Sequence, residues 1–314
     1  MFYFKSATSH PFRGNDEIVV EVKNGYTFYN ILEDLDNKQA IINPNLIKAY
    51  VKLNNISPKI IPGKFKVPSS STIDEFVKIL QNPNLTGDDV TVTIPEGYDI
   101  EAMGKVFEEK GFFSKNDFIK AVKEYTLPSY IEKRDGRKYN LEGFLFPDTY
   151  KFNKGITPIE VVKIMNGKFN EEIASLSKSY GVKNEDIYKL VIMASIVEKE
   201  AVKKDERAIV ASVFYNRLNT NMRFQSCATV LYSLGEHRDK LYEKDLEVQS
   251  PFNTYIVDGL PVGPIASPGR ESLKAAIEPA KTNYIYFVSK NDGTHFFTND
   301  YNEFLKVKEQ TQGF

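Results

Sequence analysis

The chain has 314 residues, of which 41% are hydrophobic and 26% are charged, so it is long enough for two domains and has the composition of a soluble globular protein. Its 41 basic and 42 acidic residues give a net charge of −1, which argues against a nucleic-acid partner. A single cysteine excludes an intrachain disulfide, and with only three scattered histidines we expect neither a metal site nor another cofactor.

Residues 1–17 are predicted to form a flexible stub. The chain contains no run of 18 apolar residues that would cross a membrane. It does open on an apolar stretch, Met1-Phe-Tyr-Phe4, followed by a polar tract with Pro11 and Gly14. Two interpretations stay open: a frayed terminus, or the cut end of a membrane anchor.

The sequence pattern of residues 18–82 predicts a small module that begins with a strand over 18–22. A turn at Gly25 leads into a helix with apolar residues on one face, and a second helix follows Pro44. A turn and a short strand are expected over 59–68. Thr72 and Glu75 form a capping box that opens a third helix, which runs through Leu80.

Residues 82–89 have the composition of a linker, and the first pattern recurs after them. A strand beginning at Val90 is followed by a turn with Gly97 and then by a helix through Phe107. Gly25 and Gly97 occupy equivalent places in the two strand–turn–helix units, so each is expected to adopt a positive φ. Two copies are too few for a solenoid and indicate related small units.

The remainder, residues 88–314, is predicted to be a mixed, helix-rich domain. It is expected to be mostly helical from about 115 to 220, and turn-rich between 250 and 270. A helix over 272–277 then precedes a hairpin, with one strand over 284–288 and the other over 295–298. The fold class expected for the whole chain is α+β.

A helix from Asn184, its expected cap, to Glu200 carries the two most informative acidic residues. Glu198 falls on the apolar stripe of this helix, four residues after Ala194. Glu200 lies about 200° further around, so it is expected to be a solvated surface acid that can pair with nearby lysines.

An inward carboxyl group such as Glu198 must be paired, hydrogen bonded, or placed in a cleft with a raised pKa. A raised pKa would suit a general acid that cleaves a glycosidic bond. The alternative is a structural ion pair with Arg207 or Arg217. Helical periodicity alone favours the ion pair, because structural pairs outnumber catalytic acids.

Polar and aromatic residues on the segments that follow are candidates for sugar recognition, although each could equally shape its loop. These substrate-binding candidates are Tyr215, Asn216, Arg217, Gln225, Asn253, Thr254 and Tyr255. Glu142 and Asp148, in Leu141-Glu-Gly-Phe-Leu-Phe-Pro-Asp-Thr-Tyr150, could supply a second carboxylate, but are expected to be structural turn formers.

Several blocks resemble the YceG-like family of endolytic murein transglycosylases, in the family's order over roughly residues 88–300. They are 141–150, Ala194-Ser-Ile-Val-Glu-Lys-Glu-Ala201, Val210-Ala-Ser-Val-Phe-Tyr-Asn-Arg-Leu218, Asn253-Thr-Tyr255, Gly259-Leu-Pro261, Gly263-Pro-Ile265 and Tyr286-Phe-Val288. Cys227 stands where the family usually has an aspartate. Residues 18–68 are also similar to a LysM-like module, which implies contact with peptidoglycan.

The resemblance implies that Glu198 is the catalytic acid and base. It would protonate the oxygen between N-acetylmuramic acid and N-acetylglucosamine in nascent strands, then take the proton of the attacking muramoyl 6-hydroxyl, leaving a 1,6-anhydro end. One carboxyl group suffices because the substrate supplies the nucleophile, whereas ordinary glycosidases use two. The alternatives are a two-carboxylate muramidase-type hydrolase and a non-catalytic peptidoglycan-binding scaffold.

The resemblance also implies a location and partners. Family members carry an N-terminal membrane helix, so we expect a single-pass anchor in the cell membrane, with the catalytic domain on the external side. Glycan strands of peptidoglycan are the expected partner, and cell-wall synthases are possible protein partners.

Overall fold

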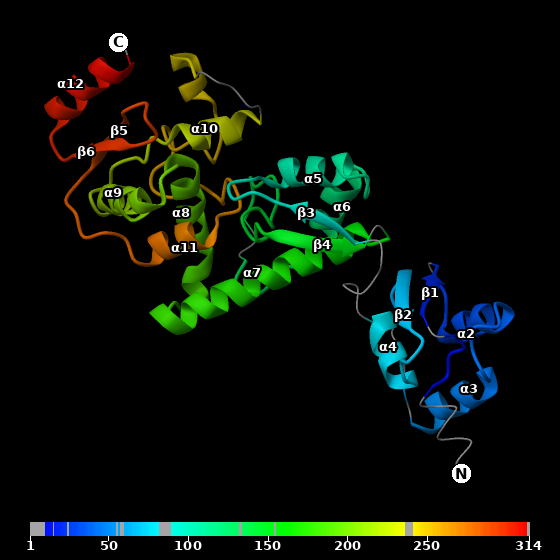
Figure 1. The fold of residues 1–314 in the computed structure, drawn as a ribbon. Coiled ribbons are helices and arrows are strands. Elements are labelled where there is room, and N and C mark those ends of the chain that lie inside the picture. The colour runs from blue at the N-terminus through cyan, green and yellow to red at the C-terminus, as the bar shows by residue number, and fades with distance from the viewer. Residues whose placement is uncertain are drawn as a thin grey trace. The chain divides into compact units, whose positions relative to one another are not determined.

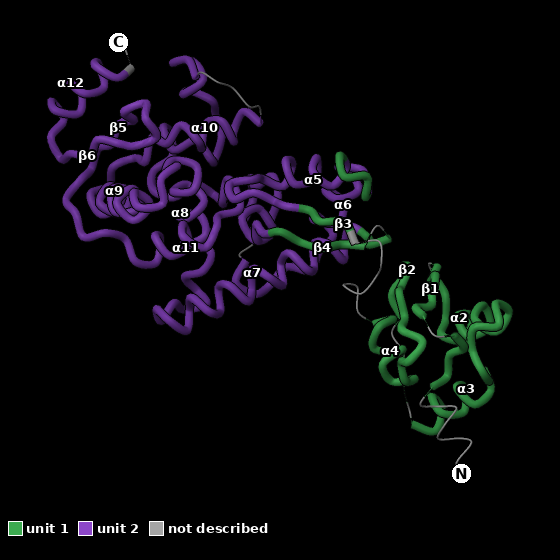
Figure 2. The backbone as a smooth tube through the Cα atoms, in the orientation of Figure 1, with its two compact units in different colours: residues 1–92, 109–112, 149–157 green, residues 93–108, 113–148, 158–314 purple. Residues whose placement is uncertain are grey.

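A computed structural model describes residues 10–14, 16–23, 25–54, 56, 60–81, 89–131, 134–153, 155–235 and 241–312 (Figure 1). The chain divides into two compact units (Figure 2). Unit 1 comprises residues 1–92, 109–112 and 149–157, and unit 2 comprises residues 93–108, 113–148 and 158–314. The predicted stub over 1–17 and the linker over 82–89 lie mostly outside the described residues.

Unit 1 is built around an antiparallel pair of strands, β1 (Glu17–Val22) and β2 (Gly63–Pro68). Two helices, α2 (Phe28–Asn37) and α3 (Pro44–Leu53), connect these strands, and α4 (Ile73–Gln81) follows β2. One hydrophobic core fills this arrangement, with Ile31, Phe65 and Phe76 fully buried at its centre. The predicted order of strand, two helices, strand and third helix is therefore confirmed.

Local signals in the sequence explain where these helices begin. Thr27 and Asn30 form a capping box at the start of α2, and the Asn43 side chain caps α3 ahead of Pro44. At α4 the N–H of Thr72 donates to the Glu75 carboxylate at 2.8 Å, and the N–H of Glu75 donates to the Thr72 hydroxyl at 3.3 Å. The capping box predicted there is confirmed.

A second two-stranded sheet joins β3 (Asp89–Thr93) to β4 (Thr149–Asn153). Gly25 and Gly97 adopt φ angles of 81° and 78°, as the repeated strand–turn–helix pattern predicts. Strand β4 was not predicted.

Unit 2 is dominated by helices, and α8 lies among three of the others (Figure 1). This helix spans Ile187–Glu200 and packs against α9 (Arg207–Asn219), α10 (Cys227–Leu234) and α11 (Arg270–Ile277). The remaining helices are α5 (Ile100–Glu109), α6 (Lys115–Glu124), α7 (Pro158–Tyr180) and α12 (Tyr301–Gln312). Short 3₁₀ turns occur at Asn184–Asp186, Lys204–Glu206 and Glu243–Glu247.

The predicted C-terminal hairpin is present as β5 (Tyr286–Ser289) and β6 (His295–Thr298), in antiparallel register. The mixed, helix-rich α+β class is thus confirmed. Three details were wrong. The region from 125 to 157 is loop and strand instead of helix, α10 and α12 were missed, and Asn184 starts a 3₁₀ turn without capping α8 by its side chain.

Candidate active site

Helix α8 supplies both acidic residues that the sequence singled out. Ten of its fourteen residues, from Ile187 through Val197 with one exception, are buried, because neighbouring helices cover it on several sides. A helix buried nearly all round has no single solvated face. Glu198 and Glu200 therefore both turn toward protein, but toward different neighbours.

The carboxylate of Glu198 is held on both oxygens. Oε1 accepts a hydrogen bond from Arg207 Nη2 at 2.8 Å, and Oε2 accepts the backbone N–H of Gly269 at 3.0 Å. The Glu198 side chain is only 4% exposed, so the predicted inward orientation is confirmed. Gly269 directly precedes α11, whose positive N-terminal end adds to the attraction for a negative charge.

Arg207 completes a structural cluster that we call the Arg207 clamp: Glu96, Glu198, Arg207 and Gly269. The guanidinium, 7% exposed, lies 2.8 Å from Glu198 and 3.3 Å from Glu96. Gly269 lies so close to Glu96 that a Cβ added at Gly269 would overlap the Glu96 carboxylate. These contacts match the ion pair that the sequence analysis left open as the alternative role for Glu198.

Glu200 is not the solvated surface acid that the periodicity predicted. It is partly buried, and its Oε1 accepts the hydroxyl of Ser226 at 2.5 Å. Burial raises the pKa of Glu200 above its ordinary value, while hydrogen bonds from Ser226 and the backbone N–H of Ala228 act in the opposite direction. Among the described residues, neither an arginine nor a lysine forms an ion pair with Glu200.

Ser226 is itself fixed by the segments around it. Its N–H donates to the Thr254 hydroxyl at 3.0 Å, and its carbonyl oxygen accepts the Thr229 hydroxyl at 2.7 Å. Gln225, the residue before it, adopts φ of +49°, a conformation that non-glycine residues rarely take outside functional or tightly constrained sites. The turn that delivers Ser226 to Glu200 is therefore highly constrained.

Two further residues extend this group, and we call Glu200, Ser226, Cys227 and Tyr255 the Glu200 cluster. The Cys227 sulfur lies 3.3 Å from the Tyr255 hydroxyl. Cys227 is exposed and Tyr255 is half-buried, so the cluster reaches solvent on this side. His295 and Arg217 also act electrostatically on the Glu200 carboxyl, in the direction that lowers its pKa. The cluster joins a partly accessible carboxyl group to polar and aromatic neighbours.

Comparison with known proteins identifies the family. The family model described as YceG-like family matches residues 20–310. This chain belongs to the YceG-like family.

Named relatives agree with this assignment. An endolytic murein transglycosylase of Bacillus subtilis is 32% identical over 303 residues, covering 93% of this chain and 84% of the relative. One of Streptococcus pneumoniae is 27% identical over 310 residues, covering 90% of this chain and 56% of the relative. The crystal structure of a YceG-like protein from Listeria monocytogenes superposes with a TM-score of 0.63 at 32% identity, covering 94% of this chain and all of that one.

In this YceG-like chain, several side chains predicted to bind substrate form hydrogen bonds with backbone groups, and their contact with substrate stays a prediction. Asn216 Nδ2 donates to the carbonyls of Thr282 and Tyr284, and Arg217 Nε donates to that of Ile285. Asn253 and Thr254 are fully buried, and Asn253 Nδ2 bonds to the carbonyls of Leu246 and Val248. Two of these four residues contact the Glu200 cluster directly: the Thr254 hydroxyl accepts the N–H of Ser226, and Asn253 Oδ1 accepts the N–H of Tyr255.

The other three residues predicted to bind substrate, Gln225, Tyr255 and Tyr215, lie in different parts of the site region. Gln225 is exposed beside Ser226, and Tyr255 belongs to the Glu200 cluster. Tyr215 donates to the carbonyl of Ala276 and lines a separate cavity of about 360 Å³, together with Leu190 and Met193 of α8. Their contact with substrate stays a prediction.

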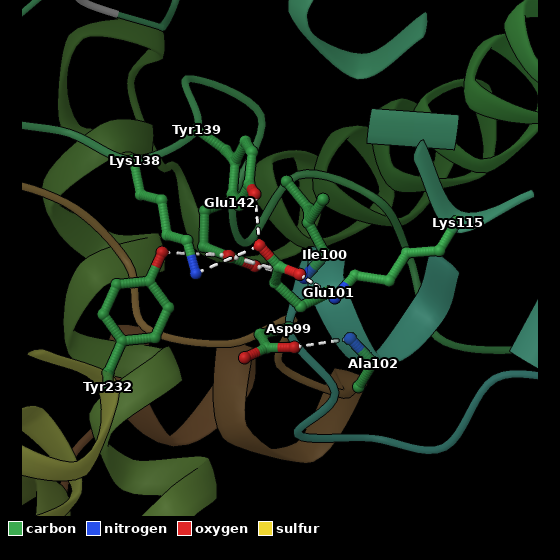
Figure 3. A network of polar contacts seen from close by, with 9 residues as sticks. All are labelled: Asp99, Ile100, Glu101, Ala102, Lys115, Lys138, Tyr139, Glu142 and Tyr232. Carbon is green, nitrogen blue, oxygen red and sulfur yellow. Dashed lines mark hydrogen bonds and ion pairs between the residues drawn. The ribbon is translucent and has the colours of Figure 1, made fainter. Parts of the chain in front are cut away.

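The remaining carboxyl candidates, Glu142 and Asp148, differ from each other. Glu142 is 1% exposed and accepts hydrogen bonds from Tyr232 and from the N–H of Ile100 (Figure 3). Asp148 is exposed, and its carbonyl oxygen accepts the N–H of Ile94. Neither belongs to the Glu200 cluster.

Ser226 and Cys227, which do belong to the Glu200 cluster, were missed as site residues because α10 was not predicted.

Within the described ranges, His, Cys, Asp and Glu side chains form no group of three suited to a metal ion. Over the same ranges, every helix is too short or too polar to cross a bilayer.

Proposed function

We propose that the chain is an endolytic lytic transglycosylase that cleaves glycan strands of peptidoglycan. Family membership over residues 20–310 and relatives named endolytic murein transglycosylase support the reaction class. The observation in the chain itself that carries the proposal is a partly buried carboxyl group with a raised pKa, Glu200, at an accessible cluster of polar and aromatic side chains.

Glu200, instead of Glu198, is the catalytic acid and base in this proposal. A general acid must hold a proton near neutral pH, and burial favours the protonated form of Glu200. The Glu198 carboxylate is bound by a buried guanidinium and by the backbone N–H of Gly269, so both of its oxygens are already engaged in structural contacts. Glu198 then links α8 to the first residue of α9 and to the start of α11.

The chemistry needs one carboxyl group. Protonated Glu200 gives its proton to the oxygen joining N-acetylmuramic acid to N-acetylglucosamine, and the muramoyl C1–O bond breaks. The carboxylate then removes the proton of the muramoyl 6-hydroxyl as its oxygen bonds to C1. The products are a 1,6-anhydromuramoyl end and a free 4-hydroxyl on N-acetylglucosamine. Glu200 is protonated again, so the cycle closes without water.

A two-carboxylate hydrolase fits the geometry less well. Inverting and retaining glycosidases place a second carboxyl about 5–9.5 Å from the first, facing the substrate. Glu142 was a candidate for that role, but it is 1% exposed and its oxygens accept hydrogen bonds from Tyr232 and Ile100.

The residues before α4 are proposed to contact peptidoglycan as a LysM-like module. The order of β1, α2, α3 and β2, with both strands paired antiparallel, agrees with the strand and helix order that suggested this resemblance. We further propose that the protein acts on the external side of the cell membrane, held there by an anchor, where cell-wall synthases produce its substrate.

The test is to digest soluble, uncrosslinked glycan strands with purified wild type, Glu200→Gln and Glu198→Gln, and to analyse the ends by mass spectrometry. Wild type should yield 1,6-anhydromuramoyl ends. Loss of a general acid typically costs about 10²–10⁴-fold in rate, so Glu200→Gln should lose nearly all activity while remaining folded. Glu198→Gln should lose stability but retain turnover in its folded fraction.

Each alternative has its own result. Ends that carry an added water would establish a hydrolase. Glycan binding without cleavage by wild type would establish a binding scaffold. If Glu198→Gln is inactive when folded and Glu200→Gln is active, the catalytic role returns to Glu198.

A further inference from the structure

Glu142 is a buried carboxyl group for which the proposed reaction has no use. One of its oxygens accepts the Tyr232 hydroxyl at 3.0 Å, and the backbone N–H of Ile100 lies 3.2 and 3.4 Å from the two oxygens. Ile100 is the first residue of α5, and Tyr232 lies in the last turn of α10. Figure 3 shows Tyr232 and Ile100 reaching Glu142 from these two separate helices.

The backbone that carries Glu142 is fixed against α8. Gly143 adopts φ of +84°, and a Cβ there would lie 2.6 Å from Pro264 Cβ and 2.9 Å from Val191 of α8. This close approach leaves no room for another side chain, so the loop is seated on α8. The hydrogen bond from Tyr232 to Glu142 therefore fixes the end of α10 relative to α8.

The other end of α10 reaches the proposed catalytic group. Ser226 immediately precedes the helix and donates to Glu200 Oε1 at 2.5 Å. The helix has eight residues and is about 12 Å long, short enough to move as a rigid rod. One end of α10 is thus tied to Glu142, and the other end touches Glu200.

We propose that Glu142, through its hydrogen bond with Tyr232, is a positioning residue that sets α10 and so holds Ser226 against the Glu200 carboxyl. This role rests on the proposed function of Glu200. The charged groups that act on Glu142 are Asp99, which disfavours its ionised form, and Lys138, which favours it. Neither lies on α10, so Tyr232 is the contact through which Glu142 acts on that helix.

The experiment uses Tyr232→Phe in the full chain, because this change deletes one hydroxyl and leaves the ring against Phe252, whose centroid is 4.8 Å away. The matched control is Tyr139→Phe. Tyr139 also donates its hydroxyl to a carboxylate of the same network, Glu101, but Glu101 belongs to α5 and, among the described residues, forms no hydrogen bond or ion pair with α10. Both variants remove a hydrogen bond from a tyrosine to a carboxylate, but only Tyr232→Phe removes one that is made by a residue of α10.

Three quantities are measured in parallel on wild type and both variants: kcat, KM on soluble glycan strands, and the pKa of Glu200 from carbon-13 NMR titration. Tyr232→Phe should lower kcat about tenfold with KM within about twofold, the size expected for losing one hydrogen bond that orients a reacting group. It should also raise the pKa of Glu200, because the Ser226 bond favours the ionised carboxyl. Tyr139→Phe should change none of the three.

A conservative variant separates positioning from folding. Glu142→Gln retains a carbonyl oxygen that can accept the Tyr232 hydroxyl, so it should keep more kcat than Glu142→Ala. Adding Tyr232→Phe to Glu142→Ala should cause no further loss, because the bond is already absent.

The inference is overturned if Tyr232→Phe leaves both kcat and the pKa of Glu200 unchanged, or if Tyr139→Phe alters them equally. The proposed function fails separately, if wild type cleaves no glycan or if Glu200→Gln remains active. In that case the Glu200 titration in wild type and Tyr232→Phe still decides whether Glu142 positions Ser226.

Discussion

Two glutamates of one helix acquire different chemistry from their nearest neighbours. Glu198 meets a buried guanidinium and a backbone N–H at a helix start, so the fold holds both of its oxygens. Glu200 is bound by the Ser226 hydroxyl, and its burial raises its pKa and so favours the protonated form, although the Ser226 bond acts in the opposite direction. Only the first is suited to structural support, and only the second to proton transfer.

Replacing Glu198 by glutamine should destabilise the fold by about 1–3 kcal/mol, because the buried Arg207 would lose a charged hydrogen-bond partner. Glu96 remains, but its side chain is 39% exposed and its bond is longer. Chemical denaturation measures the loss. Glu185→Gln is the control, since its ion pair with Lys183 is exposed on both sides and should contribute almost nothing. Equal stability of both variants would show that the clamp is dispensable.

The buried Glu142 should make stability depend on pH. Burial, with the nearby Asp99, raises the pKa of Glu142 to about 8 in the folded protein, against 4.5 for the free group. Between these values the folded state holds a proton that the unfolded state has released, so the free energy of unfolding falls as pH rises from about 4.5 to about 8. Over this pH range the full shift of the Glu142 pKa lowers the free energy of unfolding by at most about 5 kcal/mol.

Denaturation of wild type and Glu142→Gln across this pH range measures the contribution of that one group. Glu200, whose pKa is also raised, remains in both proteins. Its contribution to the pH dependence of the free energy of unfolding therefore cancels when the two proteins are compared. The stability of wild type relative to Glu142→Gln should decline as pH increases from about 4.5 to about 8. A constant difference would mean that Glu142 titrates normally.

At the scale of elements, the start of α11 depends on the absence of a side chain at Gly269. A Cβ there would overlap the Glu96 carboxylate, which must then move away from Arg207. Gly269→Ala should therefore destabilise the protein by about 1–3 kcal/mol. Gly167→Ala should act oppositely: Gly167 lies within α7 with open space around it, and alanine there should stabilise by about 0.5–1 kcal/mol. Thermal melts of both variants test the contrast.

Local signals predicted the elements of unit 1 well. The capping box of Thr72 and Glu75, the proline after Asn43 and the turn glycine Gly25 each act within a few residues, and each is confirmed. Strand β4 and helix α10 escaped prediction because they are short and depend on partners distant in sequence. Residues 149–153 become a strand only by pairing with β3.

The candidate site was only partly predictable, for a related reason. Periodicity predicted a helix over these residues and the inward direction of Glu198, but it assumed that α8 had one exposed face. Because α9, α10 and α11 all pack on α8, Glu200 is also covered. The continuous apolar run from Leu190 to Ala194 was the available signal that the helix is buried on several sides.

At the scale of the whole molecule, the segment from β1 to α4 has a hydrophobic core of its own. Every buried residue of that core lies between Phe12 and Leu80, and the partly buried residues packed on it come from the same range. A segment with its own core can in principle fold alone, although one of this size is expected to be marginally stable. The proposed LysM-like module is therefore separable by experiment.

A fragment of residues 10–81 should fold and unfold cooperatively, as followed by circular dichroism, and should sediment with purified peptidoglycan. Ile31→Asp provides the control, because it places a charge at a position that is 0% exposed and should abolish both properties. The complementary chain from residue 83 onward should still cleave short soluble strands, since the Glu200 cluster and the Arg207 clamp belong to unit 2, but it should bind whole peptidoglycan less well. A folded fragment that does not sediment would contradict a glycan-binding role for the segment, and an unfolded one would show that its core needs the rest of unit 1.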